Sequence, residues 1–201
     1  MKIGAKRRAV AAAIAGSLLL TYGCTLNHPV NMRYSPASQA KPVLMEQKTK
    51  IFLAGVEDQT GGIGLPGGII VQRSMADSLM EALRVEMPRL GFLWGDNPQT
   101  ADAVLRAAAV KADAQLESRS ALSSGDVVAE VAFRLTMADP RSGKTLWDRE
   151  FNGQGRRTRS ATGSNAAWND AYNDAFVQAC RKIGPALESE KVAAMILSSK
   201  P

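Results

Sequence analysis

The chain predicts an α+β domain, a two-layer sandwich in which two helices pack on one face of a mainly antiparallel sheet. Residues 127–137 alternate strictly between apolar and mostly polar side chains, the period of a strand with one buried face. Residues 139–144 place proline and glycine where a hairpin turns. Apolar residues fall at helical spacing in two stretches, 73–90 and 164–187. The predicted order of elements is β-α-β-β-β-α.

The first half of the domain predicts one strand and one helix. Ile51 to Val56 is a short apolar run followed by four polar residues, which is typical of a strand. A helix is expected from about Arg73 to Leu90, with Pro88 in its last turn. Gly91 can take the left-handed conformation that ends a helix, and Phe92 to Trp94 then begins a strand or a returning loop.

The middle of the domain predicts a three-stranded meander. The alanines of Ala103 to Leu116 favour a helix, whereas its length and flanks suit a long strand. We favour the strand, because the alternating strand at 127–137 and the returning strand at Thr145 to Gln154 need a partner.

A final amphipathic helix is capped by Ser164, and Gly184-Pro185 interrupts it before a second short helix at about Glu188 to Leu197. Cys180 lies within its apolar stripe, so we expect a small buried hydrophobe rather than a reactive thiol. The stripe consists of Trp168, Tyr172, Ala175, Phe176, Ala179, Ile183 and Leu187.

The first residues predict export and a lipid anchor. Four basic residues precede an apolar run from Ala9 to Leu20, which is shorter than the roughly 20 residues a membrane-spanning helix needs. Gly23 before Cys24 resembles the lipobox of bacterial lipoproteins. That resemblance implies that Cys24 carries a diacylglycerol, with palmitate among the acyl chains, and that Thr25 favours the periplasmic face of the outer membrane over the inner membrane. A cleaved signal without lipid and an uncleaved anchor are the alternatives.

Three regions follow from these features: a signal peptide at 1–23, a lipidated N-terminus with a flexible tether at 24–49, and a periplasmic domain at 50–201. The tether has three prolines among polar residues and no sustained apolar period. At up to about 3.3 Å per residue, it could hold the domain several tens of ångströms from the bilayer.

The charge of the chain gives no electrostatic footprint for nucleic acid. The formal net charge is +6, and loss of the four basic residues of the signal leaves about +2. The remaining local basic group is Arg156, Arg157 and Arg159. These three side chains are expected at a solvated strand end, with contact to an anionic ligand such as a lipid headgroup as the alternative.

The sequence indicates neither catalysis nor a cofactor. His28 is the single histidine, which excludes histidine-based triads and histidine-rich metal sites. Residues 62–67 satisfy G-x-G-x-x-G, but they lie too far from the flanking strand and helix to cradle a nucleotide, so we expect a loop. The acidic pairs Glu57/Asp58, Asp77/Glu81 and Asp148/Glu150 are expected to be surface charge, and Trp94, Trp147 and Trp168 are expected in or beside the core.

The lipobox together with the segments IFLAGVEDQT, SLMEALRVEMPRLGF, ADAVLRAAAV and VAFRLTMADPRSGKTLW resembles small bacterial envelope lipoproteins of the YajG type. The order of elements is also broadly similar to LptE-like and LpoB-like periplasmic lipoprotein domains. The resemblance implies a non-enzymatic binding or assembly module for an envelope protein or complex. The alternative is an accessory for binding or transport of lipid or glycan, such as lipopolysaccharide.

Overall fold

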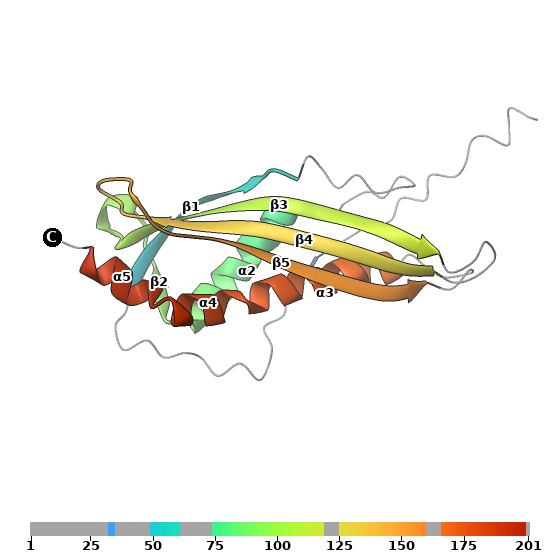
Figure 1. Cartoon of the computed structure of the whole chain (residues 1–201). Helices are drawn as coiled ribbons and strands as arrows, with labels where there is room; N and C mark the ends of the chain where they lie inside the picture. The colour runs from blue at the N-terminus through green and yellow to red at the C-terminus, as the bar shows by residue number, and fades with distance from the viewer. Residues whose placement is uncertain (1–31, 35–48, 61–73, 119–124, 160–165, 200–201) are drawn as a thin grey trace, which may run out of the picture.

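The computed structural model describes residues 32–34, 49–60, 74–118, 125–159 and 166–199 (Figure 1). Five strands form one sheet in the order β2-β1-β3-β4-β5, with helices against one face, which confirms the predicted α+β class and order of elements. The elements are β1 (Thr49–Asp58), α2 (Met75–Arg89), β2 (Phe92–Trp94), a 3-10 turn (Pro98–Thr100), β3 (Ala103–Ser118), β4 (Gly125–Ala138), β5 (Thr145–Arg159), α3 (Ala166–Arg181), α4 (Ile183–Ser189) and α5 (Val192–Ser198).

The sheet is mixed. The predicted meander is confirmed, because β3, β4 and β5 pair antiparallel over nearly their whole lengths. β1 pairs parallel with both β2 and β3. The helix α2 lies between β1 and β2 in the chain and returns it to the end of the sheet where β1 began, which makes β2 parallel to β1.

Two glycines let α3 lie directly on β5. A Cβ added to Gly155 would sit 1.9 Å from the carbonyl oxygen of Ala171, and one added to Gly153 would sit 2.0 Å from that of Ala175. Real side chains do not approach a backbone oxygen so closely, so both positions need glycine. The predicted stripe of α3 is buried here, including Tyr172.

The helix ends agree with the sequence at α2 and differ after α3. The Ser74 hydroxyl accepts a hydrogen bond from the backbone N–H of Asp77, and Gly91 takes a φ of 91° just beyond the helix. The break after α3 lies at Lys182, before the predicted Gly184-Pro185. Pro185 lies in the first turn of α4, where a backbone N–H has no intrahelical acceptor and a proline is tolerated. The predicted cap at Ser164 is outside the described residues.

Three residues of the predicted tether belong to the folded domain. Met32 is fully buried in the core, although its neighbours at 25–31 and 35–48 are outside the described residues. The backbone N–H of Arg33 donates to the side-chain oxygen of Asn173 in α3 at 2.9 Å, and the Tyr34 hydroxyl donates to the Glu86 carboxylate in α2. The domain therefore includes residues before position 49.

Cys180 is 1% exposed, and its burial raises the pKa of its thiol, which confirms the expectation of a buried hydrophobe. In the part of the chain that the structure describes, no helix is long and apolar enough to cross a membrane.

Candidate functional site

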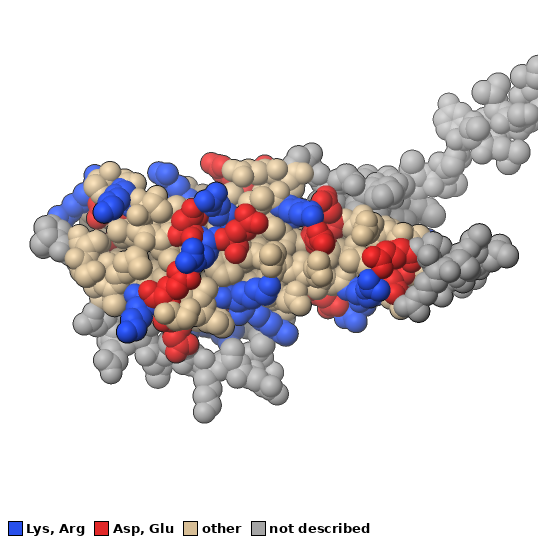
Figure 2. Space-filling view, viewed as in Figure 1, with Lys and Arg blue, Asp and Glu red and all other residues tan. Residues whose placement is uncertain are grey.

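The side of the sheet opposite α2 and α3, here called the outer face, carries most of the organised charge. Alternation along β4 sends residues such as Val131 and Phe133 toward the helices and Glu130 and Arg134 to the outer face. Figure 2 shows acidic and basic side chains interleaved along this side of the molecule. We take this face as the candidate site, because the described helices leave it uncovered.

Ion pairs cross the strands of the outer face. The Arg134 guanidinium binds both carboxylate oxygens of Asp148 and lowers the pKa of that carboxyl. Lys111 pairs with Glu130, which lowers the pKa of Glu130 and raises that of Lys111. These pairs are largely exposed, so each adds little to stability, and together they fix the pattern of charge on the face.

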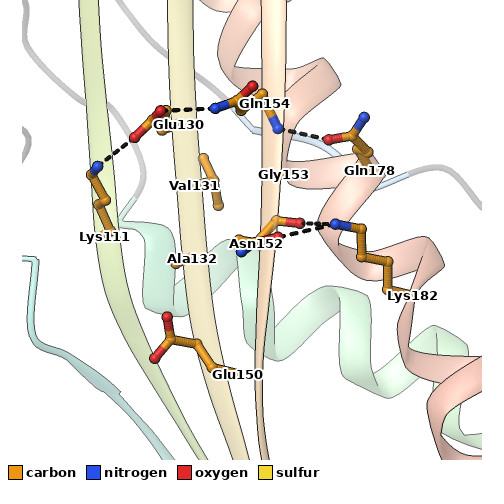
Figure 3. A pocket seen from close by; sticks show the side chains of 10 residues that line it. All are labelled: Lys111, Glu130, Val131, Ala132, Glu150, Asn152, Gly153, Gln154, Gln178 and Lys182. Atoms are coloured by element: carbon orange, nitrogen blue, oxygen red, sulfur yellow. Dashed lines mark hydrogen bonds and ion pairs between the residues drawn. The ribbon is translucent and has the colours of Figure 1, made fainter.

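A shallow groove of about 380 Å³ lies where the outer face meets the edge of β5 (Figure 3). Its lining is rich in amide and charged side chains, and it comprises Lys111, Glu130, Val131, Ala132, Glu150, Asn152, Gly153, Gln154, Gln178 and Lys182. A chain of contacts runs across it, since Gln154 donates to Glu130 through its side-chain amide at 2.9 Å. We call this feature the edge groove.

Gln178 of α3 and Lys182, the residue just after α3, satisfy backbone groups at the edge of β5 in this groove. The backbone N–H of Gln154 donates to the Gln178 side-chain oxygen at 2.7 Å. The Lys182 ammonium donates to the Asn152 carbonyl at 2.8 Å and to its side-chain oxygen at 3.0 Å (Figure 3). A free strand edge is a template for pairing with another chain, and these contacts reduce that tendency.

A second groove of about 440 Å³ lies over the other half of the outer face, between β1, β3 and β4. Arg106, Arg134 and Thr136 line it together with the stretch Ala54 to Glu57. The register of β1 against β3 shifts between Leu53 and Gly55, and Gly55 has a φ of +152°, a conformation that side-chain-bearing residues rarely adopt.

The structure does not bring the three predicted arginines together. β5 extends to Arg159, five residues beyond its predicted end, so strand alternation sends neighbours to opposite faces. Arg156 pairs with Glu117 at 2.8 Å and Asp126 at 3.2 Å on the outer face. Arg157 pairs with Asp174 of α3 at 2.6 Å on the helical side. The solvated strand end that the sequence predicted is present, with two of its three guanidinium groups held by carboxylates.

The other sequence candidates are distributed as follows. Cys24, His28 and the glycine motif at 62–67 lie outside the described residues. Glu57 and Asp58 are exposed at the end of β1, where the Gln59 side chain donates to Glu57 and Thr60 donates to Asp58. Trp147 and Trp168 are buried and Trp94 packs against the core, as expected. Across the described ranges, no group of three or more His, Cys, Asp or Glu side chains could hold a metal ion.

One buried polar cluster is not among the sites that the sequence predicts. Glu86 is 8% exposed and accepts hydrogen bonds from the Tyr34 hydroxyl and, at 2.5 Å, from Arg89. Burial and the Glu86 carboxylate both raise the pKa of Tyr34. The sequence does carry a signal for this cluster, because Glu86 follows Leu79 and Leu83 at helical spacing on the apolar stripe of α2, a position where a charged side chain is unexpected.

Comparisons with known proteins place the fold among bacterial proteins of solved structure. The neuraminyllactose-binding hemagglutinin homolog of Helicobacter pylori has a TM-score of 0.60 at 15% identity, over 85% of this chain and 98% of that one. Protein XCC0632 of Xanthomonas campestris has a TM-score of 0.54 at 14% identity, over 83% and 98%. Lipoprotein GNA1162 of Neisseria meningitidis, with a TM-score of 0.41 at 12% identity over 72% and 99%, is too distant to support an inference.

At these identities the likeness shows a shared fold. No protein-family model matches the chain, and no curated protein matches it in sequence.

Proposed function

We propose that the chain is a lipoprotein anchored through Cys24 to the periplasmic face of the bacterial outer membrane. The support is the ordered succession of a basic start, a short apolar run and Gly23-Cys24. Several buried acyl chains hold a protein far more firmly than one, at about 0.8 kcal/mol per CH₂.

Labelling with a fatty acid in cells tests the anchor. We expect wild type and Cys180→Ser to be labelled and Cys24→Ser to remain unlabelled, because Cys180 is buried and lies outside the lipobox. Equal labelling of wild type and Cys24→Ser would refute the lipid anchor and the localisation that depends on it.

For the domain we propose a non-enzymatic binding or assembly role toward an envelope protein. The observation that carries it is the outer face, an uncovered sheet surface with a fixed pattern of charge and two grooves. Such a surface suits electrostatic recognition of a folded partner, since fixed charges of both signs favour one docking register.

Site-specific photocrosslinking in cells tests this role and its surface. A photoreactive residue at Glu150 lies on the outer face, and one at Arg84 lies on the exposed side of α2 as a matched control. We expect a discrete adduct with an envelope protein from Glu150 and none from Arg84. Adducts from Arg84 alone would move the docking surface to the helices, and no adduct from either position would contradict the binding role.

A second candidate is glycan binding in the edge groove, which the notable density of amide side chains there favours. Asn152, Gln154 and Gln178 present planar donors and acceptors of the kind that bind sugar hydroxyls. The structurally similar Helicobacter pylori protein carries the name of a neuraminyllactose-binding hemagglutinin homolog. Calorimetric titration with sialyllactose and with lipopolysaccharide oligosaccharides, on wild type and Gln154→Ala, tests it; heat that is the same for both proteins would rule this groove out.

A further inference from the structure

The helical layer has a seam that the chain fills with its own N-terminal residues. α2 packs on β1, β2 and β3, whereas α3 packs mainly on β4 and β5 and also touches β3 (Figure 1). Within the described ranges, α2 and α3 do not pack closely against each other. Residues 32–34 contact both helices, through Asn173 on α3 and Glu86 on α2.

Three different contacts hold this segment, and each uses different chemistry. Met32 adds a fully buried apolar side chain to the core. Arg33 uses its backbone N–H, so that contact does not depend on the side chain. Tyr34 supplies a hydroxyl to the buried Glu86 carboxylate, whose other described partner is Arg89.

We propose that residues 32–34 form a latch that docks in the seam between α2 and α3 and sets how far the domain can reach from the membrane. The proposal rests on the lipid anchor at Cys24. Met32 follows Cys24 by eight residues, so with the latch docked the attachment point of the domain at Met32 lies within roughly 28 Å of the anchored residue, whatever conformation the intervening residues take.

Release of the latch would raise the maximum distance between Cys24 and the domain's attachment point about threefold. The next described attachment of the chain to the domain is Thr49 at the start of β1, twenty-five residues after Cys24. A chain of that length extends to at most roughly 85 Å. The same domain could then contact partners close to the bilayer in one state and far from it in the other.

Cys180 provides a readout of docking that does not require the lipid. It is 1% exposed and lies on α3, and its burial, together with the Glu86 carboxylate that accepts the Tyr34 hydrogen bond, raises the pKa of its thiol. In the full chain carrying Cys24→Ser, Cys180 is the remaining thiol. We compare its rate of reaction with a maleimide in that chain, in a latch variant (Met32→Ala with Tyr34→Ala), and in Met137→Ala, which removes an equally buried methionine on β4.

We expect Cys180 to react at least tenfold faster in the latch variant than in Met137→Ala when urea is used to bring both to the same stability. Equal rates at matched stability would overturn the latch, since they would show that the seam does not open locally.

The second arm measures reach with the anchored chain in phospholipid vesicles that contain a dansyl-labelled lipid. Energy transfer from the domain's tryptophans should be strong for wild type and Met137→Ala and at least twofold weaker for the latch variant. Transfer that is equal for all three would overturn the control of distance. If Cys24 carries no lipid, fatty-acid labelling fails while the maleimide arm still reports docking, so failure of the anchor and failure of the latch are distinguishable.

Discussion

Gly155→Ala tests the close contact between α3 and β5. The added Cβ would lie 1.9 Å from the carbonyl oxygen of Ala171 and 2.8 Å from its carbonyl carbon. An unstrained carbon contact needs about 3.5 Å, so the helix and strand must separate locally by roughly 1.5 Å. The obstacle is backbone, so no side-chain rotation can relieve it.

The structure sets the size of the effect at the upper end for overpacking. A gap of 0.5–1 Å already forfeits about a quarter to a half of the dispersion energy of the atoms involved. The separation would loosen fully buried neighbours on α3 such as Tyr172 and Phe176. We therefore expect a loss of about 3 kcal/mol, against about 1–3 kcal/mol for overpacking in general.

Urea denaturation followed by circular dichroism measures the loss. With an m-value of about 1.5 kcal/mol per molar, the midpoint of Gly155→Ala should fall by about 2 M. Gly95→Ala is the matched control, because its nearest neighbours would lie at an ordinary 3.6 Å, and it should change stability by less than about 0.5 kcal/mol.

A second substitution separates backbone from side-chain obstruction. Ala171→Gly in the Gly155→Ala background should restore nothing, because the obstructing oxygen remains. A midpoint for Gly155→Ala within about 0.3 M of wild type would refute the close-contact reasoning, and rescue by Ala171→Gly would assign the obstruction to a side chain.

Three further outcomes are expected. The Cys180 thiol, whose pKa is raised by burial, should react with a disulfide reagent at pH 8 at least a hundredfold more slowly in the folded domain than in denaturant; similar rates would contradict its burial. Arg134 lowers the pKa of Asp148 in the folded state, so the ion pair stabilises the fold fully above about pH 4 and loses this effect as the pH falls through the folded-state pKa. Wild type should therefore lose more free energy of unfolding between pH 5 and pH 2 than Asp148→Asn does. Parallel plots of stability against pH for the two proteins would refute the ion pair. Gln178→Ala with Lys182→Ala frees backbone groups at the edge of β5 and should increase self-association in sedimentation experiments relative to Arg181→Ala, an exposed position at the end of α3; unchanged association would show that the edge needs no such protection.

Local pattern was enough to predict most elements. The strand period of β4, the turn at 139–144 and the helical stripes of α2 and α3 each depend on residues close in sequence. Asp139 shows this directly, since its carboxylate accepts hydrogen bonds from the backbone N–H groups of Arg141 and Ser142 within the predicted turn. Gly91 ends α2 for the same reason, because the need for a left-handed residue there is local.

The tertiary structure alone decided the contacts between residues far apart in the chain. The sequence does not show that β1 pairs parallel with β3, because register in a sheet depends on the partner strand. Gly153 and Gly155 become necessary only once α3 crosses them, and Met32 becomes a core residue only once α2 and α3 leave a seam beside it. The sequence determined where strands and helices form, and packing over long chain separations determined that a piece of the predicted tether belongs to the domain.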